Sequence, residues 1–114
     1  MSKSLGEKGE SAAAEFLRDR GYTILARNFR SRGGELDIIA MKDHVLHFIE
    51  VKSRKNTLYG EPAEYVTPAK IRRMVKAIEY YLYSHRLYDE PMQIDVIAIT
   101  AGRIDFIEDA VILQ

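Results

Sequence analysis

The sequence predicts an α/β domain in which a central mixed β-sheet is flanked by helices, with the elements in the order α-β-β-β-α-β-β. Two segments carry apolar residues at helical spacing, and five shorter segments are rich in the β-branched and aromatic residues that favour strands. The chain has 114 residues, 46% of them hydrophobic, which suits one hydrophobic core. We therefore expect residues 1–114 to form a single domain with one helix on each side of the sheet.

The first half of the chain predicts one helix and three strands. Residues 5–20 are rich in Ala, Glu, Leu and Lys, and Gly21 follows at the point where a helix would end. An Arg- and Gly-rich turn at 30–34 separates the first two strands, and the short connection at 42–44 makes the last two a hairpin. We expect these strands at 22–28, 35–41 and 45–53.

The second half predicts a loop, a helix and two strands. Residues 54–66 have no clear period and predict a loop that can reorganise around a ligand. Thr67 and Pro68 predict a helix start, because Thr can cap the first turn and Pro needs no N–H there. We expect this helix to run to about Leu87, and strands to follow at 92–100 and 103–107.

The composition excludes several classes of protein. The absence of Cys excludes a disulfide scaffold, a thiolate metal site and a Cys nucleophile, and it fits a reducing compartment. No apolar stretch approaches the roughly 20 residues of a membrane span, and the start, MSKSLGEKGE, lacks the apolar core of a secretory signal. We therefore expect a cytoplasmic protein without a membrane partner, and we expect the chain shown to be the mature chain.

Charge is unevenly distributed, although 17 basic and 17 acidic side chains give a formal net charge of zero. Residues 52–76 contain seven basic and two acidic side chains, whereas residues 77–114 contain two basic and seven acidic ones. A local basic patch can therefore meet phosphates while the whole molecule stays neutral.

Two carboxylates are predicted to meet on neighbouring strands. Residues two apart on a strand share a face, so Glu50 and Lys52 project together, as do Glu35 and Asp37 on the strand before. If these strands pair, Asp37 and Glu50 can lie side by side, and such a contact needs a cation or a proton between the two groups. Lys52 is one candidate for that cation, and a divalent metal is the other.

A carboxylate pair of this kind suits Mg²⁺ or Mn²⁺, which take hard oxygen ligands. Asp37 and Glu50 would supply two ligands and the backbone carbonyl of Val51 a third, while Lys52 would orient or help to deprotonate an attacking water. These roles together describe a phosphodiester hydrolase. The alternative is structural: Glu50 and Lys52 form a polar pair at a strand end, and Asp37 is a surface charge near a turn.

The order of these residues resembles a known superfamily of nucleases. A helix carrying Glu10 precedes GELDIIA at 34–40 and FIEVKSR at 48–54, an order that is similar to the PD-(D/E)xK nuclease superfamily, whose core is D, a spacer and then E-x-K. More narrowly, RNFRSRGGELDIIA, FIEVKSRKNTLYGEP and the K-x-R-R of residues 70–73 resemble the YraN-type bacterial proteins, which are similar to archaeal Holliday-junction resolvases. The resemblance covers nearly the whole chain, and it departs from the superfamily motif in placing Leu36, not proline, before the aspartate.

The resemblance implies a restriction-endonuclease-like core and a metal-dependent endonuclease acting on structured DNA. It implies that Asp37 and Glu50 bind the metal and that Lys52 is the catalytic lysine. It also implies that an acid on the first helix, best matched by Glu10, holds the metal or a water beside it. Similarity to resolvases further implies a homodimer, because two copies of one site suit a two-fold symmetric junction.

Glu10 is also singled out by its position on the predicted helix. It lies within one helical step of Ala13, Ala14 and Leu17, at the edge of the predicted buried stripe, where an acid needs a partner. The alternative is a half-exposed surface glutamate.

The second predicted helix has a basic face opposite its core stripe. At 100° per residue the stripe comprises Ile71, Met74, Val75, Ile78 and Leu82. Lys and Arg on the opposite face can neutralise phosphates, and Tyr can stack on an exposed base. We expect this face and the basic residues of the neighbouring loops to form a positive rim around the carboxylates. The alternative is that the face is only a charged surface in contact with solvent. The predicted nucleic-acid-binding residues are Arg30, Arg32, Arg54, Lys55, Lys70, Arg72, Arg73, Lys76 and Tyr80.

Three further polar residues lie outside this constellation. His44 and His47 have an H-x-x-H spacing, but a turn and a strand do not direct both rings to one metal, so we interpret them as a turn residue and a strand residue. Asp95 lies among apolar strand residues, and such an aspartate favours a basic neighbour that the sequence does not identify.

Two other functions compete with a nuclease. One is a non-cleaving nucleic-acid-binding module with the same fold. The intact set of Asp37, Glu50 and Lys52 favours the enzyme over this module. The other is a small interaction protein whose acidic segment at 77–114 binds a basic partner, and it predicts that DNA binding is absent. For the enzyme, the substrate alternatives are a junction, a flap, a single strand or RNA.

Overall fold

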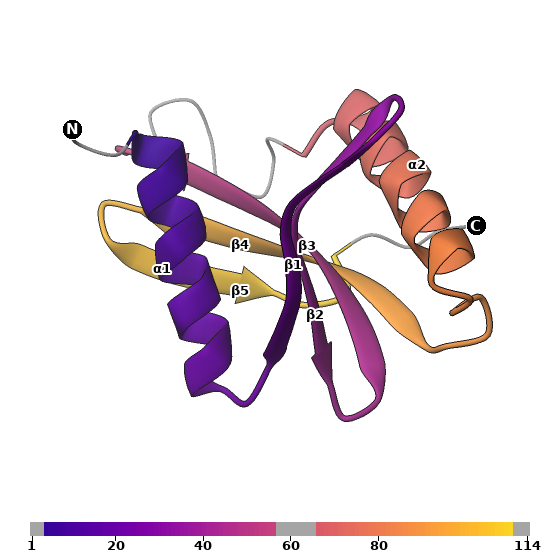
Figure 1. Cartoon of the computed structure of the whole chain (residues 1–114). Helices are drawn as coiled ribbons and strands as arrows, with labels where there is room; N and C mark the ends of the chain where they lie inside the picture. Colours follow the sequence, from indigo (N-terminus) through magenta and orange to yellow (C-terminus); the bar gives the residue numbers. More distant parts are fainter. Residues whose placement is uncertain (1–3, 57–65, 111–114) are drawn as a thin grey trace.

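The computed structural model describes residues 4–56 and 66–110, and it places a five-stranded mixed sheet between two helices (Figure 1). The predicted element order and the mixed sheet are both confirmed. Most of the loop predicted at 54–66 lies outside the described residues. The elements are α1 (Leu5–Asp19), β1 (Thr23–Ser31), β2 (Gly34–Lys42), β3 (Val45–Arg54), α2 (Pro68–Ser84), β4 (Met92–Thr100) and β5 (Arg103–Ile107).

Both helices begin at side-chain caps. The Ser4 hydroxyl accepts a hydrogen bond from the Glu7 N–H at 3.1 Å, and the Thr67 hydroxyl accepts one from the Lys70 N–H at 3.2 Å, with Pro68 following Thr67 as predicted. A capping hydroxyl satisfies an N–H that has no partner within the helix. The cap at Thr67 is the short-range signal that located the start of α2 in the sequence, whereas the start of α1 was predicted from its composition.

The end of α2 differs from the prediction, because the helix stops at Ser84 and not near Leu87. Arg86 takes a left-handed φ of 56°, and its N–H bonds to the Tyr83 carbonyl while the Leu87 N–H bonds to the Leu82 carbonyl. This hydrogen-bond pattern ends helices, usually with glycine at the left-handed position. The same pattern ends α1 at Gly21, and there the glycine in the sequence predicted the end of the helix.

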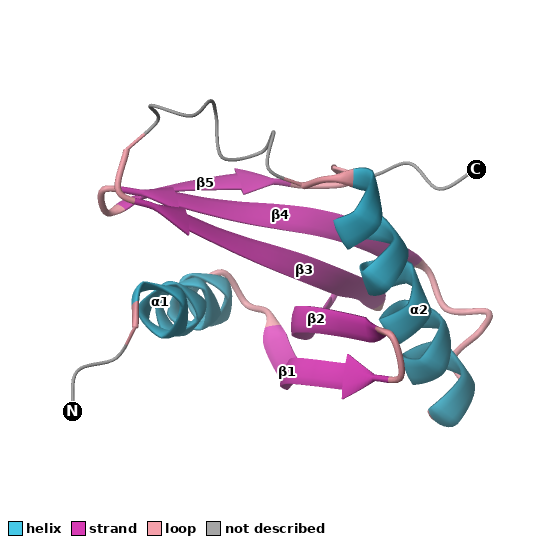
Figure 2. Cartoon of the chain, turned by 90° about the horizontal axis from the view of Figure 1, so that it is seen from above, coloured by secondary structure: helices cyan, strands magenta, loops and turns pink. Residues whose placement is uncertain are grey.

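The strands are ordered β1-β2-β3-β4-β5 across the sheet, and every neighbouring pair is antiparallel except β3 and β4. The parallel pair is joined through α2, which therefore begins near the C-terminal end of β3. Seen from above, the strands fan out, with α1 and α2 well separated (Figure 2). Among the described residues, no helix is long and apolar enough to cross a membrane.

Two hydrophobic clusters cover the sheet, one beneath each helix. Ala13, Ala14 and Leu17 of α1 pack with Ile38 and Ile49, among others. On the other side, α2 packs against a cluster that includes Leu36, Phe48 and Ile94. The predicted core stripe of α2 is partly wrong: Met74 and Ile78 are buried as expected, but the stripe continues through Ala77 and Tyr81 while Ile71, Val75 and Leu82 are only partly buried.

Close approach at Gly34 explains the shift of that stripe. A Cβ on Gly34 would lie 2.6 Å from the Ala77 nitrogen and 2.8 Å from the Arg73 carbonyl oxygen. Both atoms belong to the backbone of α2 and cannot rotate away. The helix therefore rests on β2 at Ala77, the side chain small enough for that contact.

An irregularity where β1 and β2 face each other changes which side chains share a face. The alternation of a regular strand predicts from the sequence that Leu36, Ile38 and Ala40 share one face. That prediction is wrong, because Leu36 packs beneath α2 together with Ile39, whereas Ile38 and Ala40 pack beneath α1. Asn28, which lies between the pairs Arg27–Ile38 and Phe29–Leu36, has a left-handed φ of 52°. Such a residue interrupts the alternation of a strand, and Asp37 lies opposite it.

Candidate metal centre and nucleic-acid interface

The candidate site lies where β2 and β3 separate. These strands pair only as far as Ile38 and Ile49, while β3 continues to pair with β4 up to Arg54. Beyond Ile49, the N–H of Val51 donates to the Asp37 carboxylate, with a nitrogen to oxygen distance of 2.8 Å. The Asp37 side chain thus accepts the hydrogen bond that a partner strand would otherwise accept.

Asp37 and Glu50 are brought into contact at this split. Glu50 is only 2% exposed. Burial, together with the charge and the hydrogen bond of Asp37, raises the pKa of Glu50 to about 8. Near neutral pH the folded chain therefore keeps a proton between the two carboxyl groups. The Glu50 Oε2 atom is buried and receives no hydrogen bond from an N–H or hydroxyl group of the described residues.

Two lysines reach Glu50 from different elements. The Lys52 Nζ atom lies 3.9 Å from Glu50 Oε1, and the Lys70 Nζ atom lies 3.4 Å from the same oxygen. Lys70 also lies 2.7 Å from Glu35 Oε1, and the Glu35 carboxyl is 3.3 Å from Arg73. The lysine ammonium groups compensate part of the negative charge that the acidic pair would carry after losing its proton.

Lys70 therefore belongs to the acidic site, although the sequence assigned it to the nucleic-acid surface. Its burial disfavours the ammonium, but the hydrogen bond to Glu35 and the charges of Glu50 and Asp37 outweigh that effect, so the pKa of Lys70 is raised. The hydrogen bond from Lys70 lowers the pKa of Glu35 in turn. The signal for this contact is topological, because a crossover helix that follows β3 must begin near the end of β3.

Glu10 approaches Asp37 from α1, whereas Glu50 contacts it from β3. Burial, followed by the charge and hydrogen bond of Asp37, raises the pKa of Glu10. The close packing of α1 on β3 places it there, since a Cβ on Gly9 would lie 2.0 Å from the Ser53 Oγ atom. Asp37 is thus the middle member of a row of three acids that comes from α1, β2 and β3.

Asn28 supports Glu10, and the sequence analysis did not identify it. With its amide nitrogen turned toward Glu10, Asn28 donates to the two carboxylate oxygens at 2.7 and 3.1 Å, whereas the opposite orientation would place acceptors against each other. This contact lowers the pKa of Glu10, against the larger upward effect of burial. The sequence signal was weak, because an Asn within a strand pattern is only occasionally left-handed.

The donor atoms at the split fit a hard divalent cation. Asp37 and Glu50 provide two carboxyl groups, and one Glu50 oxygen is buried without an N–H or hydroxyl donor. In antiparallel pairing a residue directs its N–H and its carbonyl toward the same neighbouring strand, so the Val51 carbonyl faces the Asp37 side of β3. Within residues 4–56 and 66–110, no three His, Cys, Asp or Glu side chains are arranged to hold a metal together, so waters or a substrate would complete the coordination.

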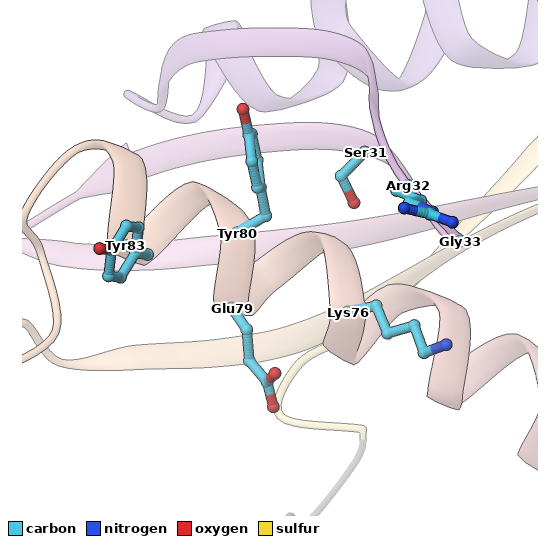
Figure 3. Close-up of a pocket in the computed structure, with 7 residues that line it drawn as sticks. All are labelled: Ser31, Arg32, Gly33, Lys76, Glu79, Tyr80 and Tyr83. Atoms are coloured by element: carbon cyan, nitrogen blue, oxygen red, sulfur yellow. The ribbon is translucent and has the colours of Figure 1, made fainter.

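A groove lies between the β1–β2 turn and α2, and one of its lining residues, Arg73, is 3.3 Å from Glu35. One cavity, of about 700 Å³, is lined by residues of the turn and of the exposed face of α2 (Figure 3). A second, of about 280 Å³, shares Gly33 and Lys76 with the first and adds Ala69, Arg72 and Arg73. The lining of the larger cavity comprises Ser31, Arg32, Gly33, Lys76, Glu79, Tyr80 and Tyr83.

The structure gathers most, but not all, of the predicted nucleic-acid residues at this groove. Arg32, Arg72, Arg73, Lys76 and Tyr80 line its two cavities. The others lie elsewhere: Arg30 is exposed on β1 opposite Glu35, Arg54 ends β3, Lys55 is exposed beyond it, and Lys70 contacts the acids.

The partner of Asp95 is His47. The His47 Nδ1 and Asp95 Oδ2 atoms lie 2.6 Å apart, and Asp95 Oδ1 accepts hydrogen bonds from Gln93 and from the Asp109 N–H. His44 is an exposed turn residue with a φ of 65°, so the interpretation of the two histidines as turn and strand residues is confirmed.

Comparisons with known proteins add a family. The model of the Uncharacterised protein family UPF0102 matches residues 9–99, a span that includes all three acids and both lysines. A UPF0102 protein of Clostridium perfringens is 43% identical over 115 residues, which cover 96% of this chain and 94% of that protein. One of Symbiobacterium thermophilum is 47% identical over 102 residues, covering 90% and 86% of the two chains. Another, of Wolinella succinogenes, is 43% identical over 109 residues, covering 96% and 97%.

Proposed function

The chain belongs to the UPF0102 family, the YraN-type family that its sequence resembles, and we propose that it is a metal-dependent endonuclease of the PD-(D/E)xK superfamily acting on structured DNA. The contact between Asp37 and Glu50 at the split of β2 and β3 carries this proposal. The half-buried Asp37 carboxylate opposes the ionisation of the buried Glu50 beside it. A bound cation would remove that opposition, which gives the arrangement a function that a structural ion pair lacks.

In this proposal Asp37, Glu50 and the Val51 carbonyl hold Mg²⁺ or Mn²⁺. When bound, the cation supplies Lewis-acid polarisation of the phosphate and a lower pKa for a coordinated water. Glu50 must first lose its proton, and the charges of Lys70 and Lys52 favour that loss because they stabilise the carboxylate. In this proposal Lys52, the more exposed of the two lysines, orients a water or a phosphate oxygen.

The remaining groups position these residues. The Val51 N–H fixes one oxygen of Asp37, and Glu35 fixes Lys70 at 2.7 Å. Glu10 is a second acceptor beside Asp37, and Asn28 orients it through two hydrogen bonds. The groove along α2 supplies positive charge for the phosphates on either side of the cleaved bond.

A cleavage assay with isosteric variants tests this function. The full chain is incubated with a four-way junction and with a linear duplex, in Mg²⁺, in Mn²⁺ and in EDTA. Wild type should cut the junction only with metal, and Asp37→Asn and Glu50→Gln should each abolish cutting while remaining folded. Asp43→Asn is the matched control, because Asp43 is an exposed acid at the opposite end of the same hairpin, with a φ of 50° that Asn tolerates. Cutting by Asp37→Asn at the wild-type rate would overturn the assignment.

A non-cleaving nucleic-acid-binding module is the second candidate, and the two lysines favour it. Lys52 and Lys70 already place positive charge beside Glu50 without a metal. If this candidate is correct, wild type binds DNA in Mg²⁺ and Mn²⁺ but leaves every substrate intact, and Asp37→Asn binds as tightly as wild type.

A further inference from the structure

We infer that the groove between the β1–β2 turn and α2 binds an unpaired segment of a nucleic-acid strand, so that the substrate is DNA with single-stranded nucleotides beside the cleaved bond. The inference that the groove binds a strand is argued from the groove alone and does not depend on cleavage. The inference that this strand lies beside a cleaved bond rests on the proposed function.

Exposed aromatic rings at one end of the groove are the first observation. Five large hydrophobic side chains of the described residues are exposed, and three of them are Tyr80, Tyr83 and Tyr88, with 55%, 71% and 57% of their surface exposed. Tyr80 and Tyr83 line the larger cavity. Exposed rings grouped in one place are uncommon on a surface that binds nothing.

These rings are held in position by neighbouring side chains. The Tyr80 ring lies against Phe29 of β1, with centroids 6.1 Å apart and planes tilted by 37°. Tyr83 meets Tyr88 edge to face at 5.9 Å, and the Tyr88 hydroxyl donates to the Tyr83 carbonyl at 3.2 Å. A ring that is already positioned loses little conformational freedom when a base stacks on it.

Positive charge at the other end of the groove is the second observation. Arg32 and Lys76 line the larger cavity, and Arg72 and Arg73 line the smaller one toward the acids. Glu79 is the single acid among the lining residues, and Figure 3 shows it pointing away from Tyr80. A strand that passes on the Arg32 side therefore meets cations and rings while avoiding this carboxylate.

Spacing along α2 connects the groove to the acids. Lys70 and Tyr80 are ten residues apart, which corresponds to about 15 Å along a helix. A strand in a duplex advances about 3.4 Å per nucleotide, so the rings lie roughly four nucleotides from the acids. Bases inside a continuous duplex are stacked on one another and closed to side chains, so tyrosines at this distance can stack only on unpaired bases.

Binding measured without metal tests the groove separately from cleavage. The full chain in EDTA is titrated against a fluorescent 12-nucleotide single strand and against the same sequence as a duplex, with anisotropy as the readout. A 2-aminopurine in the single strand reports stacking through quenching. Wild type should prefer the single strand, and the double variant Tyr80→Leu/Tyr83→Leu should lose at least tenfold in affinity for it together with the quenching, because each stacked base contributes about 1–3 kcal/mol.

Matched variants separate stacking from general attraction to anions. Tyr80→Phe/Tyr83→Phe should bind as wild type, because the rings remain. The Leu variant should keep its affinity for the duplex, because the cations remain. Equal affinity of wild type for single strand and duplex, or undiminished single-strand binding by the Leu variant, would overturn the inference. A 12-residue polyglutamate serves as a competing anion without bases. If it displaces the single strand equally well from wild type and from the Leu variant, the groove is a general anion-binding surface and the inference is overturned.

Cleavage of gapped and continuous duplexes distinguishes failure here from failure of the nuclease proposal. If wild type cuts neither the four-way junction nor the gapped or continuous duplex in Mg²⁺ or Mn²⁺, while Asp37→Asn binds the single strand normally, the nuclease proposal fails and the binding site is supported. If wild type cuts and the Leu variant cuts gapped and continuous duplexes with the same preference as wild type, the nuclease proposal is supported and this inference fails.

Discussion

The central residue of the site is Asp37, whose carboxyl group contacts acids on both sides and accepts the Val51 N–H. Its neighbours differ in their surroundings. Glu50 is buried beside two lysines, whereas Glu10 is half-buried and held by Asn28. The pKa values of both neighbours are raised, and that of Glu50, at about 8, keeps a proton in the row at a neutral pH where a separate carboxylate would be ionised.

The raised pKa of Glu50 predicts that the metal-free chain loses stability as pH rises. The folded chain keeps the Glu50 proton up to a pKa of about 8, but the unfolded chain loses it near 4.5. Between these values folding takes up a proton, so the contribution of Glu50 is fully present below pH 4.5 and is lost as pH rises through about 8. Glu50→Gln cannot ionise, so its advantage over wild type should grow across this window, by several kcal/mol at most because one pKa unit corresponds to about 1.4 kcal/mol.

Denaturant unfolding of both proteins at several pH values, with EDTA present, measures this difference. Asp43→Asn should show no comparable gain, since Asp43 is exposed. A stability difference between Glu50→Gln and wild type that stays constant from pH 5 to pH 9 would contradict a shared proton at this site.

Asn28 provides a second test of the acid row. Asn28→Gly tolerates the left-handed backbone but removes the amide that donates to Glu10, so the pKa of Glu10 should rise further. Carbon-detected NMR titration of the Glu10 carboxyl group measures it. Asn28→Ala should give the same pKa with an additional loss of stability of about 1 kcal/mol, because Ala disfavours this conformation. An unchanged Glu10 pKa in both variants would show that the amide does not support the acid.

Whole elements position these side chains through the close approach of α1 to β3. α1 packs on β3 at Gly9, where a Cβ would lie 2.0 Å from the Ser53 Oγ atom and 3.3 Å from its Cβ. Gly9→Ala should therefore push α1 away from the sheet and destabilise the chain by about 1–2 kcal/mol. The double variant Gly9→Ala/Ser53→Ala should recover most of that loss, because it removes the nearer of the two atoms.

Thermal unfolding of the two single variants and the double variant measures this coupling. If Ser53→Ala gives no recovery in the Gly9→Ala background, the contact does not fix the distance between α1 and β3.

Sequence patterns predicted the elements well because their signals are local. The cap at Thr67 and the left-handed Gly21 are properties of a few neighbouring residues, and the strand segments stand out by their β-branched and aromatic residues. The prediction failed where one residue departs from its usual conformation. Arg86 ends α2 in place of glycine, and its residue type does not mark such a position. The alternation of β2 changes opposite the left-handed Asn28, and an asparagine there is only a weak signal.

The arrangement of the whole molecule explains which site residues could be predicted. Asp37 and Glu50 come together through a hairpin, whose short connection the sequence displays. Lys70 reaches Glu50 only because α2 crosses over the sheet between two parallel strands, and Glu10 reaches Asp37 only because α1 packs on β3. The contacts of Lys70 and Glu10 depend on how the helices pack on the sheet, and the spacing of residues along the chain does not show that packing.

The uneven distribution of charge predicts salt-dependent DNA binding by a chain of zero net charge. Arg72→Ala/Lys76→Ala removes two cations from the groove. Affinity should fall, and the slope of log affinity against log salt should decrease in magnitude by up to about 2. Lys8→Ala/Arg18→Ala removes two exposed cations from α1 and is the matched control. Equal effects of the two double variants on the salt slope would show that DNA does not use the groove.

Calorimetric titration of Mn²⁺ into metal-free wild type and Asp37→Asn, at a pH above 8 where Glu50 can ionise, tests the proposed metal site most directly. Wild type should bind one Mn²⁺ per chain, and Asp37→Asn should bind none at the same concentrations while it remains folded. Equal binding by the two proteins, or no binding by wild type with or without DNA present, would contradict the proposal that Asp37 and Glu50 hold a metal.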